Sequence, residues 1–310
     1  MRLASFESTV YQMDGRAVEA DHQTPTRALR LCSYMSAHSN SDTVLHSDDR
    51  VTIAAIAILA FVFADVAHEV VGHGVGFLIA GGRSCILTTT RLIETQRLGD
   101  RGGDIFDLGG PFGNLVFAGV PWLAQRLLRR SAPRLRLLLC LLMAFSLFWG
   151  FAYLIFCGVF ARGDWFALIR GMPYLWLWRI LFVAAGIVLY RGSVRLVASE
   201  LRWIVSASDA NRRFRVRRLV FTSYVAGGLI ACAGAALDPR GAMEILRSGA
   251  LSSFAAAVGL LEVPHLFLVS GEGHATAHDF VYRNLGWILA AAAVSIFYIA
   301  VLGPGIKATF

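Results

Sequence analysis

Four ionisable residues lie close together inside a long apolar segment near the start of the chain. In "FADVAHEVVGHGVGFLIAGG" (61–80), these residues are Asp65, His68, Glu69 and His73. On an α-helix, at 100° per residue, Asp65, Glu69 and His73 follow one another at i, i+4 and i+8. His68 lies three residues after Asp65. All four therefore fall within an arc of about 140°, so one side of this helix is ionisable and the rest is apolar.

Such a stripe suits metal chemistry. An ionisable group inside a membrane is costly unless it is paired or binds a metal, so it marks a functional site. Two imidazoles on one helix face, with a carboxylate from elsewhere, can hold zinc by three ligands and leave a fourth position for water. A neighbouring glutamate can take that water's proton. The alternative is structural: Asp65 with His68, and Glu69 with His73, could pair at helix spacing and neutralise one another.

The two histidines are one residue further apart than in the zinc-protease motif H-E-x-x-H. Residues 68–73, HEVVGH, read H-E-x-x-x-H, and on a regular α-helix histidines five apart diverge by about 140°. A single π-type turn, with i→i+5 hydrogen bonds, would realign them, and Gly72 is a place where the backbone can deform. Alternatively Glu69 and His73, a true i, i+4 pair, could be ligands while His68 has another role. We favour the π-type turn.

The composition is typical of a polytopic helical membrane protein. Of the 310 residues, 56% are hydrophobic and 16% are charged, outside the usual balance of soluble proteins. A transmembrane helix needs roughly 20 apolar residues. Apolar runs of about that length lie at 51–80, 109–125, 135–161, 174–190, 219–237 and 285–303. A seventh run, near 250–268, is interrupted by Glu262 and Pro264 and is interpreted as a broken or re-entrant helix. We expect six or seven transmembrane helices.

Two further segments complete the predicted architecture. Residues 1–50 are polar and mixed in charge, and we interpret them as a disordered tail. The transmembrane domain then covers 51–310, with a metal-site core at about 51–170. Residues 84–99 are rich in β-branched residues and bracketed by glycines, which predicts a small β-hairpin between the first two spans. The predicted fold class is an all-α polytopic membrane protein with this hairpin.

The net charge of +8 comes almost wholly from arginine, concentrated at 125–136 and 191–218. Basic loops beside apolar spans follow the positive-inside rule, so the expected partner of these loops is the lipid bilayer and not nucleic acid. The rule places both loops and the N-terminal tail in the cytoplasm, and the far end of the first span outside. The loop at 81–104, on the outer side in this arrangement, also carries four arginines. The expected location is the plasma (inner) membrane of a bacterium.

Two segments resemble motifs of one enzyme family. "HEVVGHGVGFLIAGG" is similar to an H-E-x-x-H helix with one residue inserted, and "GGPFGNLVFAG" (109–119) is similar to a Gly-Pro-x-x-Asn segment. In this order, with a hairpin-like loop between them, they resemble the site-2 protease family of intramembrane zinc metalloproteases. The resemblance covers roughly 50–120 and little of the rest.

The resemblance implies a Zn²⁺-dependent endopeptidase that hydrolyses peptide bonds of membrane-embedded substrates. In its terms His68 and His73 are zinc ligands, and Glu69 is the catalytic base that takes a proton from the attacking water. The family's third ligand is an aspartate, commonly in a Leu-Asp-Gly setting on a later span. No such tripeptide follows here, and the nearest counterpart is Asp164 in "ARGDWFALIRG". The alternative is that Asp164 caps a short interfacial helix, Trp165–Arg170.

Asp65 and Asn114 are the expected supporting residues. Asp65 can orient His68 through the other ring nitrogen. Asn114, the Asn of the Gly-Pro-x-x-Asn segment, helps in family terms to hold the substrate or the active-site arrangement; its structural alternative is a hydrogen bond between close-packed helices. The hairpin at 84–99 could bind an extended substrate by β-augmentation. The resemblance also implies a metal site near the cytoplasmic face, which conflicts with the arginine distribution.

Other functions stay open. The inserted residue and the missing Leu-Asp-Gly fit a catalytically inactive, protease-like scaffold that binds membrane-protein clients, and the ionisable stripe also fits a proton- or ion-handling protein. His274 and His278 in "SGEGHATAHDF" (270–280) could form a second metal site, although the adjacent glycines favour an ordinary loop. A membrane di-iron oxygenase is disfavoured because the sequence has no H-x-x-H-H box.

Overall fold

The structure is a computed structural model that describes residues 47–128, 132–206, 211–269 and 280–310. Most of the predicted tail, and the segment with His274 and His278, lie outside the described residues. The first helix begins at Arg50, capped by the Asp49 side chain, which accepts a hydrogen bond from the Thr52 N–H at 2.9 Å. Asp48 is buried, so the packed part of the chain includes residues just before 51.

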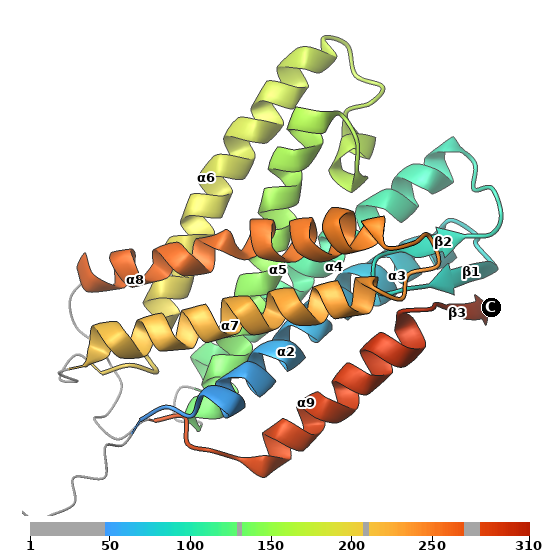
Figure 1. The fold of residues 1–310 in the computed structure, drawn as a ribbon. Helices are drawn as coiled ribbons and strands as arrows, with labels where there is room; N and C mark the ends of the chain where they lie inside the picture. Colours follow the sequence, from blue (N-terminus) through green and yellow to red (C-terminus); the bar gives the residue numbers. More distant parts are fainter. Residues whose placement is uncertain (1–46, 129–131, 207–210, 270–279) are drawn as a thin grey trace, which may run out of the picture. The chain divides into compact units, whose positions relative to one another are not determined.

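The chain forms an all-α polytopic membrane protein with one small sheet (Figure 1). In chain order the elements are α2 (Arg50–Val66), η1 (Ala67–His73), α3 (Gly74–Ile79), β1 (Ser84–Leu87), β2 (Leu92–Glu94), α4 (Asp100–Leu127), α5 (Pro133–Phe160), η2 (Asp164–Leu168), α6 (Leu175–Leu201), α7 (Arg212–Ala235), η3 (Ile245–Ala255), η4 (Ala256–Val258), α8 (Gly259–Val269), α9 (Leu285–Phe297), η5 (Tyr298–Leu302) and β3 (Ile306–Thr309). Within the described ranges, six helical segments are long and apolar enough to cross a membrane. The predicted fold class is confirmed.

The six segments differ from the expected set at two places. The run predicted to be broken at Glu262 and Pro264 is helical through both residues, as part of the segment Ile245–Leu266. Glu262 is tolerated there because it pairs with Arg191 of the neighbouring helix α6. The run at 109–125 lies in α4, which is not one of the six, because its glycines, Pro111, Pro121, Asn114 and Gln125 lower the mean hydropathy of the run itself.

Helix α4 nevertheless has a face suited to lipid. Beyond its charged first turns, one side is buried against the neighbouring helices, including Asn114 and Ala118. The other side exposes apolar side chains at helical spacing: Phe112, Val116, Val120, Leu123 and Leu127. An apolar stripe of this kind fits a helix that lies at the edge of a membrane bundle. We therefore count α4 as a seventh long helix of the same bundle.

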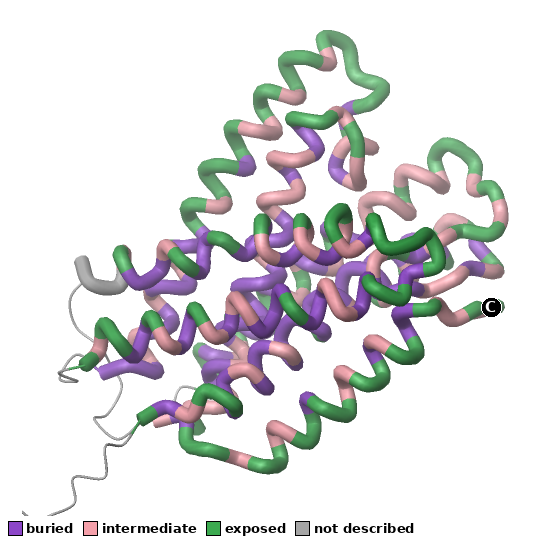
Figure 2. The backbone as a smooth tube through the Cα atoms, in the orientation of Figure 1, coloured by how far each residue is buried: buried purple, intermediate pink, exposed green. Residues whose placement is uncertain are grey.

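The span that carries the ionisable stripe is the most enclosed of the six. In its most apolar stretch 72% of the residues are buried, against 22% for α6 and 17% for the α9–η5 segment. Figure 2 shows the same contrast, with α2 and α5 mostly buried and α6 and α9 mostly exposed. The ionisable side chains are thus kept away from lipid, where an unpaired charge would be costly.

The predicted hairpin is present and has a third strand. β1 and β2 are antiparallel, with Leu87 opposite Leu92, and the Thr88 N–H donates to the Arg91 carbonyl across the turn. β3, close to the end of the chain, pairs with the other edge of β1, giving the order β2-β1-β3. The sequence did not predict β3, because four residues after Gly305 are too few to show an alternating pattern.

Backbone contact between η1 and α4 joins the two family-like motifs. A Cβ atom on Gly72 would overlap the Gly109 carbonyl oxygen and lie 2.8 Å from Gly110 Cα. A Cβ on Gly113 would overlap the Ala67 carbonyl oxygen in the same way. Small residues allow helices in membranes to approach this closely. The glycines of both segments therefore fix the distance between the histidine-bearing turn and α4.

We predict that Gly72→Ala destabilises the protein by about 1–3 kcal/mol, because the added methyl group has no room beside α4. Gly74→Ala is the matched control, since a Cβ at Gly74 has no heavy atom within 4 Å. The control variant should keep or slightly exceed wild-type stability. Thermal unfolding of the detergent-purified proteins measures both. Equal melting temperatures for the two variants would contradict the close contact.

Candidate metal centre

The two histidines lie on a π-helical turn. Residues Ala67–His73 form η1, between α2 and α3, so the helix widens where the motif has its extra residue. The imidazole rings are buried and their centroids lie 4.9 Å apart, edge to face. The prediction of a π-type turn that brings both histidines to one side is confirmed. The alternative, in which Glu69 and His73 are the ligands and His68 has another role, assumed a regular α-helix here, which these residues do not form.

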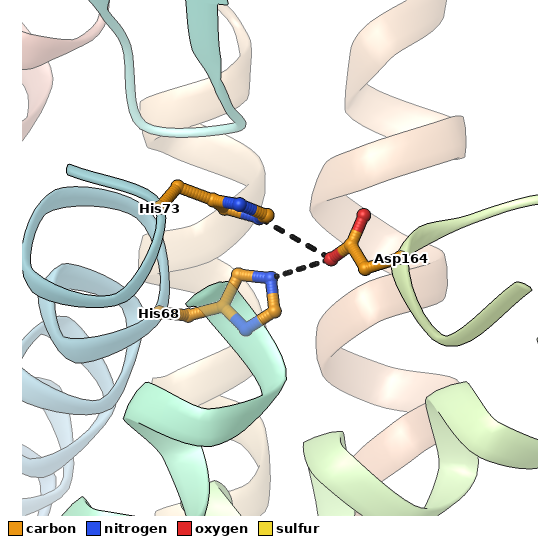
Figure 3. A group of neighbouring side chains, drawn as sticks. All are labelled: His68, His73 and Asp164. Carbon is orange, nitrogen blue, oxygen red and sulfur yellow. Dashed lines mark ion pairs between the residues drawn. The ribbon is translucent and has the colours of Figure 1, made fainter. Parts of the chain in front are cut away.

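The histidines meet the predicted aspartate (Figure 3). Oδ2 of Asp164 lies 3.2 Å from Nε2 of His68 and 3.2 Å from Nε2 of His73. Asp164 is the first residue of η2, just after α5, and the N-cap position belongs to Gly163, with no side-chain cap. The N-cap interpretation of Asp164 is therefore wrong. Its carboxylate instead completes a group of three ligand-type side chains whose donor atoms all lie within 4.8 Å.

Each imidazole is held by its other nitrogen. The His73 Nδ1–H donates to the Phe106 carbonyl oxygen at 2.8 Å, and the side-chain amide of Asn114 is hydrogen-bonded to His68 Nδ1 at 3.0 Å. Trp149 stacks on the His68 ring with centroids 5.0 Å apart and planes 12° apart. Such contacts orient the ring so that Nε2 is presented to the site. Asn114 thus holds the His68 ring and links two helices, as its structural interpretation expected, and its role toward a substrate stays a prediction.

The hydrogen bonds of His73 show why a cation fits between these groups. A carbonyl oxygen can only accept, so Nδ1 carries a proton, and in a neutral ring Nε2 then has a lone pair. That lone pair would face a carboxylate oxygen at 3.2 Å, which is repulsive unless a proton or a metal ion lies between them. The geometry therefore calls for positive charge at the point where the three side chains meet.

Asp164 supplies negative charge to this point. Burial alone would raise the pKa of its carboxyl, but the contacts with His68 and His73 outweigh burial and lower the pKa below its usual range. The carboxylate is therefore ionised at neutral pH. Its second oxygen, Oδ1, accepts a hydrogen bond from the Tyr153 hydroxyl at 3.3 Å. That bond leaves Oδ2 as the oxygen presented to the two imidazoles.

Glu69 is fixed beside the cluster by the hairpin. Its Oε1 lies 4.0 Å from His68 Nε2, and its Oε2 accepts a hydrogen bond from the Leu92 N–H at 3.1 Å. In an antiparallel hairpin, residue pairs that share backbone hydrogen bonds alternate with pairs that do not. Thr88 and Arg91 are a hydrogen-bonded pair, so the next pair, Leu87 and Leu92, is a non-hydrogen-bonded one. The Leu92 N–H therefore points away from β1, toward the metal centre.

The expected role of Asp65 is wrong. It accepts a hydrogen bond from the Tyr298 hydroxyl at 3.0 Å, and His68 has Asn114 as its partner. The physical reason is that both side chains have partners on distant segments, Tyr298 for Asp65 and Asn114 for His68. Asp65 instead ties the first span to η5, and the same Tyr298 hydroxyl lies 3.4 Å from the Thr89 carbonyl oxygen of the hairpin turn.

All five ionisable candidates line one cavity of about 1160 Å³. Its walls come from η1, the hairpin turn at Thr89–Leu92, α5, the Gly163–Asp164 connection and the start of η3. A cavity of this size can hold a peptide segment as well as water. Asn114 does not line the cavity and supports His68 from behind.

Several residues that contact the candidate metal centre could not be recognised from the sequence. The Phe106 carbonyl and the Leu92 amide are backbone groups, and Tyr298 is one apolar-span residue among many. Trp149 and Tyr153 lie on a span with no ionisable residues around them. Only the Gly-Gly-Pro segment at 109–111 hinted at a close approach to the histidines, because such glycines let backbones meet.

No family model matches the chain, and no curated protein or solved structure matches it. The similarity to site-2 proteases therefore remains an interpretation of residues 50–120. The function has to be argued from the geometry of the site.

We predict that Tyr298→Phe destabilises the protein by about 1–3 kcal/mol, because buried Asp65 loses its hydrogen-bond donor. Tyr224→Phe is the control, since no hydrogen bond of the Tyr224 hydroxyl is found among the described residues. It should change the stability by less than about 0.5 kcal/mol. Thermal unfolding in detergent compares the two. Equal losses would mean that the Tyr298 hydroxyl contributes nothing specific.

Proposed function

We propose that this protein is an intramembrane zinc metalloprotease that hydrolyses peptide bonds of membrane-embedded substrates. The observation that carries the proposal is the convergence of His68, His73 and Asp164 on one point, with Glu69 beside them. These residues come from two segments about 90 positions apart and meet inside the bundle, in a cavity large enough for a peptide.

The three side chains fit zinc. Two imidazole nitrogens and a carboxylate oxygen are a donor set of catalytic zinc sites, which keep a fourth position open. With bond lengths near 2.0–2.2 Å, neighbouring ligand atoms of a tetrahedral zinc lie about 3.3 Å apart; here both Nε2–Oδ2 distances are 3.2 Å. Gly110 leaves room beside the two imidazoles because it has no side chain. A Cβ at this position would lie 2.5 Å from His73 Nε2 and 2.7 Å from His68 Nε2.

The chain's own residues fit the roles that peptide hydrolysis needs. Zinc, when bound, lowers the pKa of water and polarises a peptide carbonyl. Glu69 is the carboxylate placed to take a proton from water and return it to the leaving amine. Because its Oε2 is fixed by Leu92, its Oε1 is the oxygen left to face the cluster. Tyr153 and Asn114 keep Asp164 and His68 in place.

The free edge of β2 supports a peptide substrate. A transmembrane helix hides its carbonyls in i→i−4 hydrogen bonds, so a substrate has to be extended before it can be cleaved. β2 pairs only with β1 in the described sheet. The outward-pointing Leu92 N–H already donates to Glu69, so the Leu92 carbonyl and the backbone groups of Glu94 are those that face an added strand. An extended segment can add to this edge, next to Glu69.

Metal content is the first test. We expect about one zinc per chain in the detergent-purified wild type, and loss of zinc in His73→Ala and in Asp164→Ala, because three ligands are the minimum of such sites. Asp104→Ala is the control, since Asp104 pairs with Arg170 outside the cluster. Elemental analysis measures all four. A wild type without zinc would remove the proposal and favour a protease-like scaffold or a proton-handling protein.

Glu69→Gln separates an enzyme from a scaffold. We expect this variant to keep its zinc but to cleave tagged single-span substrates about 10²–10⁴-fold more slowly, the range typical of a lost general base. Glu94→Gln, an exposed carboxylate of the same hairpin, should cleave like the wild type. Substrate and product are quantified in proteoliposomes. Unchanged cleavage by Glu69→Gln would exclude the assigned role of Glu69, and a zinc-loaded wild type without cleavage would point to a scaffold.

A further inference from the structure

We infer that the metal centre opens toward the non-cytoplasmic side of the membrane, so that its substrates are membrane segments reached from that side. The substrate class rests on the proposed function, whereas the orientation rests on the fold and on the charges of the chain. The inference runs against the cytoplasmic placement that the family resemblance implies.

The connections between the helices gather at two ends. One end, here called the site end, contains the hairpin, the connections 161–174 and 236–244, and β3. Contacts hold its parts together: Thr90 donates to Asp238, Arg170 pairs with Asp104, and β3 pairs with β1. Asp164 belongs to the same end, immediately after α5. The mouth of the metal-site cavity is therefore formed by segments of the site end.

The other end, here called the arginine-rich end, contains the start of α2 and the helix ends around 128–136, 202–218 and 280–284. The Arg215 Nε donates to Asp48 at 2.8 Å, and the Val281 N–H donates to the same carboxylate at 2.8 Å. Arg136 donates to the Trp203 carbonyl. These contacts show that the connections on this side also lie together, apart from the metal centre.

The metal centre lies near one membrane boundary and not at the midplane. His68 is 18 residues after the start of α2, or roughly 27 Å along the helix, close to the full thickness of a hydrocarbon core of about 30 Å. Tyr174 and Trp176, at the start of α6 and therefore at the site end, are 75% and 63% exposed. Exposed tyrosine and tryptophan mark the interface between lipid and water.

The basic residues are unequally divided between the two ends. From residue 47 on, the chain has 25 arginines and lysines; 13 lie at 125–136 and 191–218, and Arg50 and Arg283 add to the same end. The remaining ten belong to the site end. Residues 1–46, which precede α2 in the sequence, contain four more arginines. The positive-inside rule then places the arginine-rich end in the cytoplasm.

This orientation has a consequence for the substrate. Water and metal reach the cluster from outside the cell, through the mouth lined by the hairpin turn and η3. The cleaved bond of a substrate lies in the outer half of the membrane, because the cluster lies close to the outer boundary. The fragment on the outer side of that bond is then released away from the cytoplasm.

Cysteine labelling tests the orientation without any assay of activity. Gly99→Cys and Gly171→Cys probe the site end, since both glycines are exposed and have open space at the Cβ position. Ser47→Cys and Leu128→Cys, both exposed, probe the arginine-rich end. Cys32 and the half-buried Cys232 are replaced by serine, and the buried Cys85, Cys140 and Cys157 are kept. Bacterial spheroplasts are treated with a membrane-impermeant maleimide before and after permeabilisation.

We expect the Gly99→Cys and Gly171→Cys variants to react in intact spheroplasts, and the Ser47→Cys and Leu128→Cys variants to react only after permeabilisation. The opposite pattern would overturn the inference, and so would equal labelling of all four before permeabilisation. The same labelling in a Glu69→Gln background separates the two proposals, because the orientation needs neither zinc nor cleavage. A failed protease test would leave the orientation standing, and a reversed orientation would leave the zinc site standing.

Discussion

The metal centre depends on one extra residue in the helix that carries both histidines. On a regular α-helix the five-residue spacing would turn His68 away from His73, and the π turn at Ala67–His73 removes that divergence. The widened turn is covered by the backbone of Gly109, Gly110 and Gly113 on α4, at distances that no larger side chain allows. The same crossing brings Asn114 and the Phe106 carbonyl to the histidine rings. The π turn and its close packing against α4 therefore act together to position the two histidines.

The three carboxylates at the cluster each have a partner from another element of the chain. Asp65 has the Tyr298 hydroxyl, Glu69 has the Leu92 amide, and Asp164 has the two imidazoles. A charge in a membrane interior is tolerated when its hydrogen bonds are satisfied in this way. The partners also restrict movement: η5 and the hairpin hold the first span from one side, and η2 holds it from another.

The features that the sequence predicted are local or periodic ones. The transmembrane helices follow from the lengths of the apolar runs, the hairpin from residues 84–99, and the π turn from a spacing mismatch within six residues. The role of Asp65 was misjudged because the partners that decide it, Tyr298 for Asp65 and Asn114 for His68, lie on distant segments. Tyr298 and β3 were missed because their partners lie more than 200 residues away in sequence. The choice between ligand and N-cap for Asp164 needed the path of the chain after α5, which no local pattern contains.

The hairpin connects the proposed base to the proposed substrate site. Strand register, and not the identity of the side chain, decides that the Leu92 N–H points out of the sheet, because inner and outer pairs alternate along an antiparallel ladder. That N–H holds Glu69, and the same edge offers the outward-pointing groups of Glu94 to an extended peptide. A shift of the register by one residue would turn the Leu92 amide back toward β1 and leave Glu69 without its donor. The pairing of β1 with both β2 and β3 therefore contributes to the site as directly as the ligands do, since it keeps this register fixed.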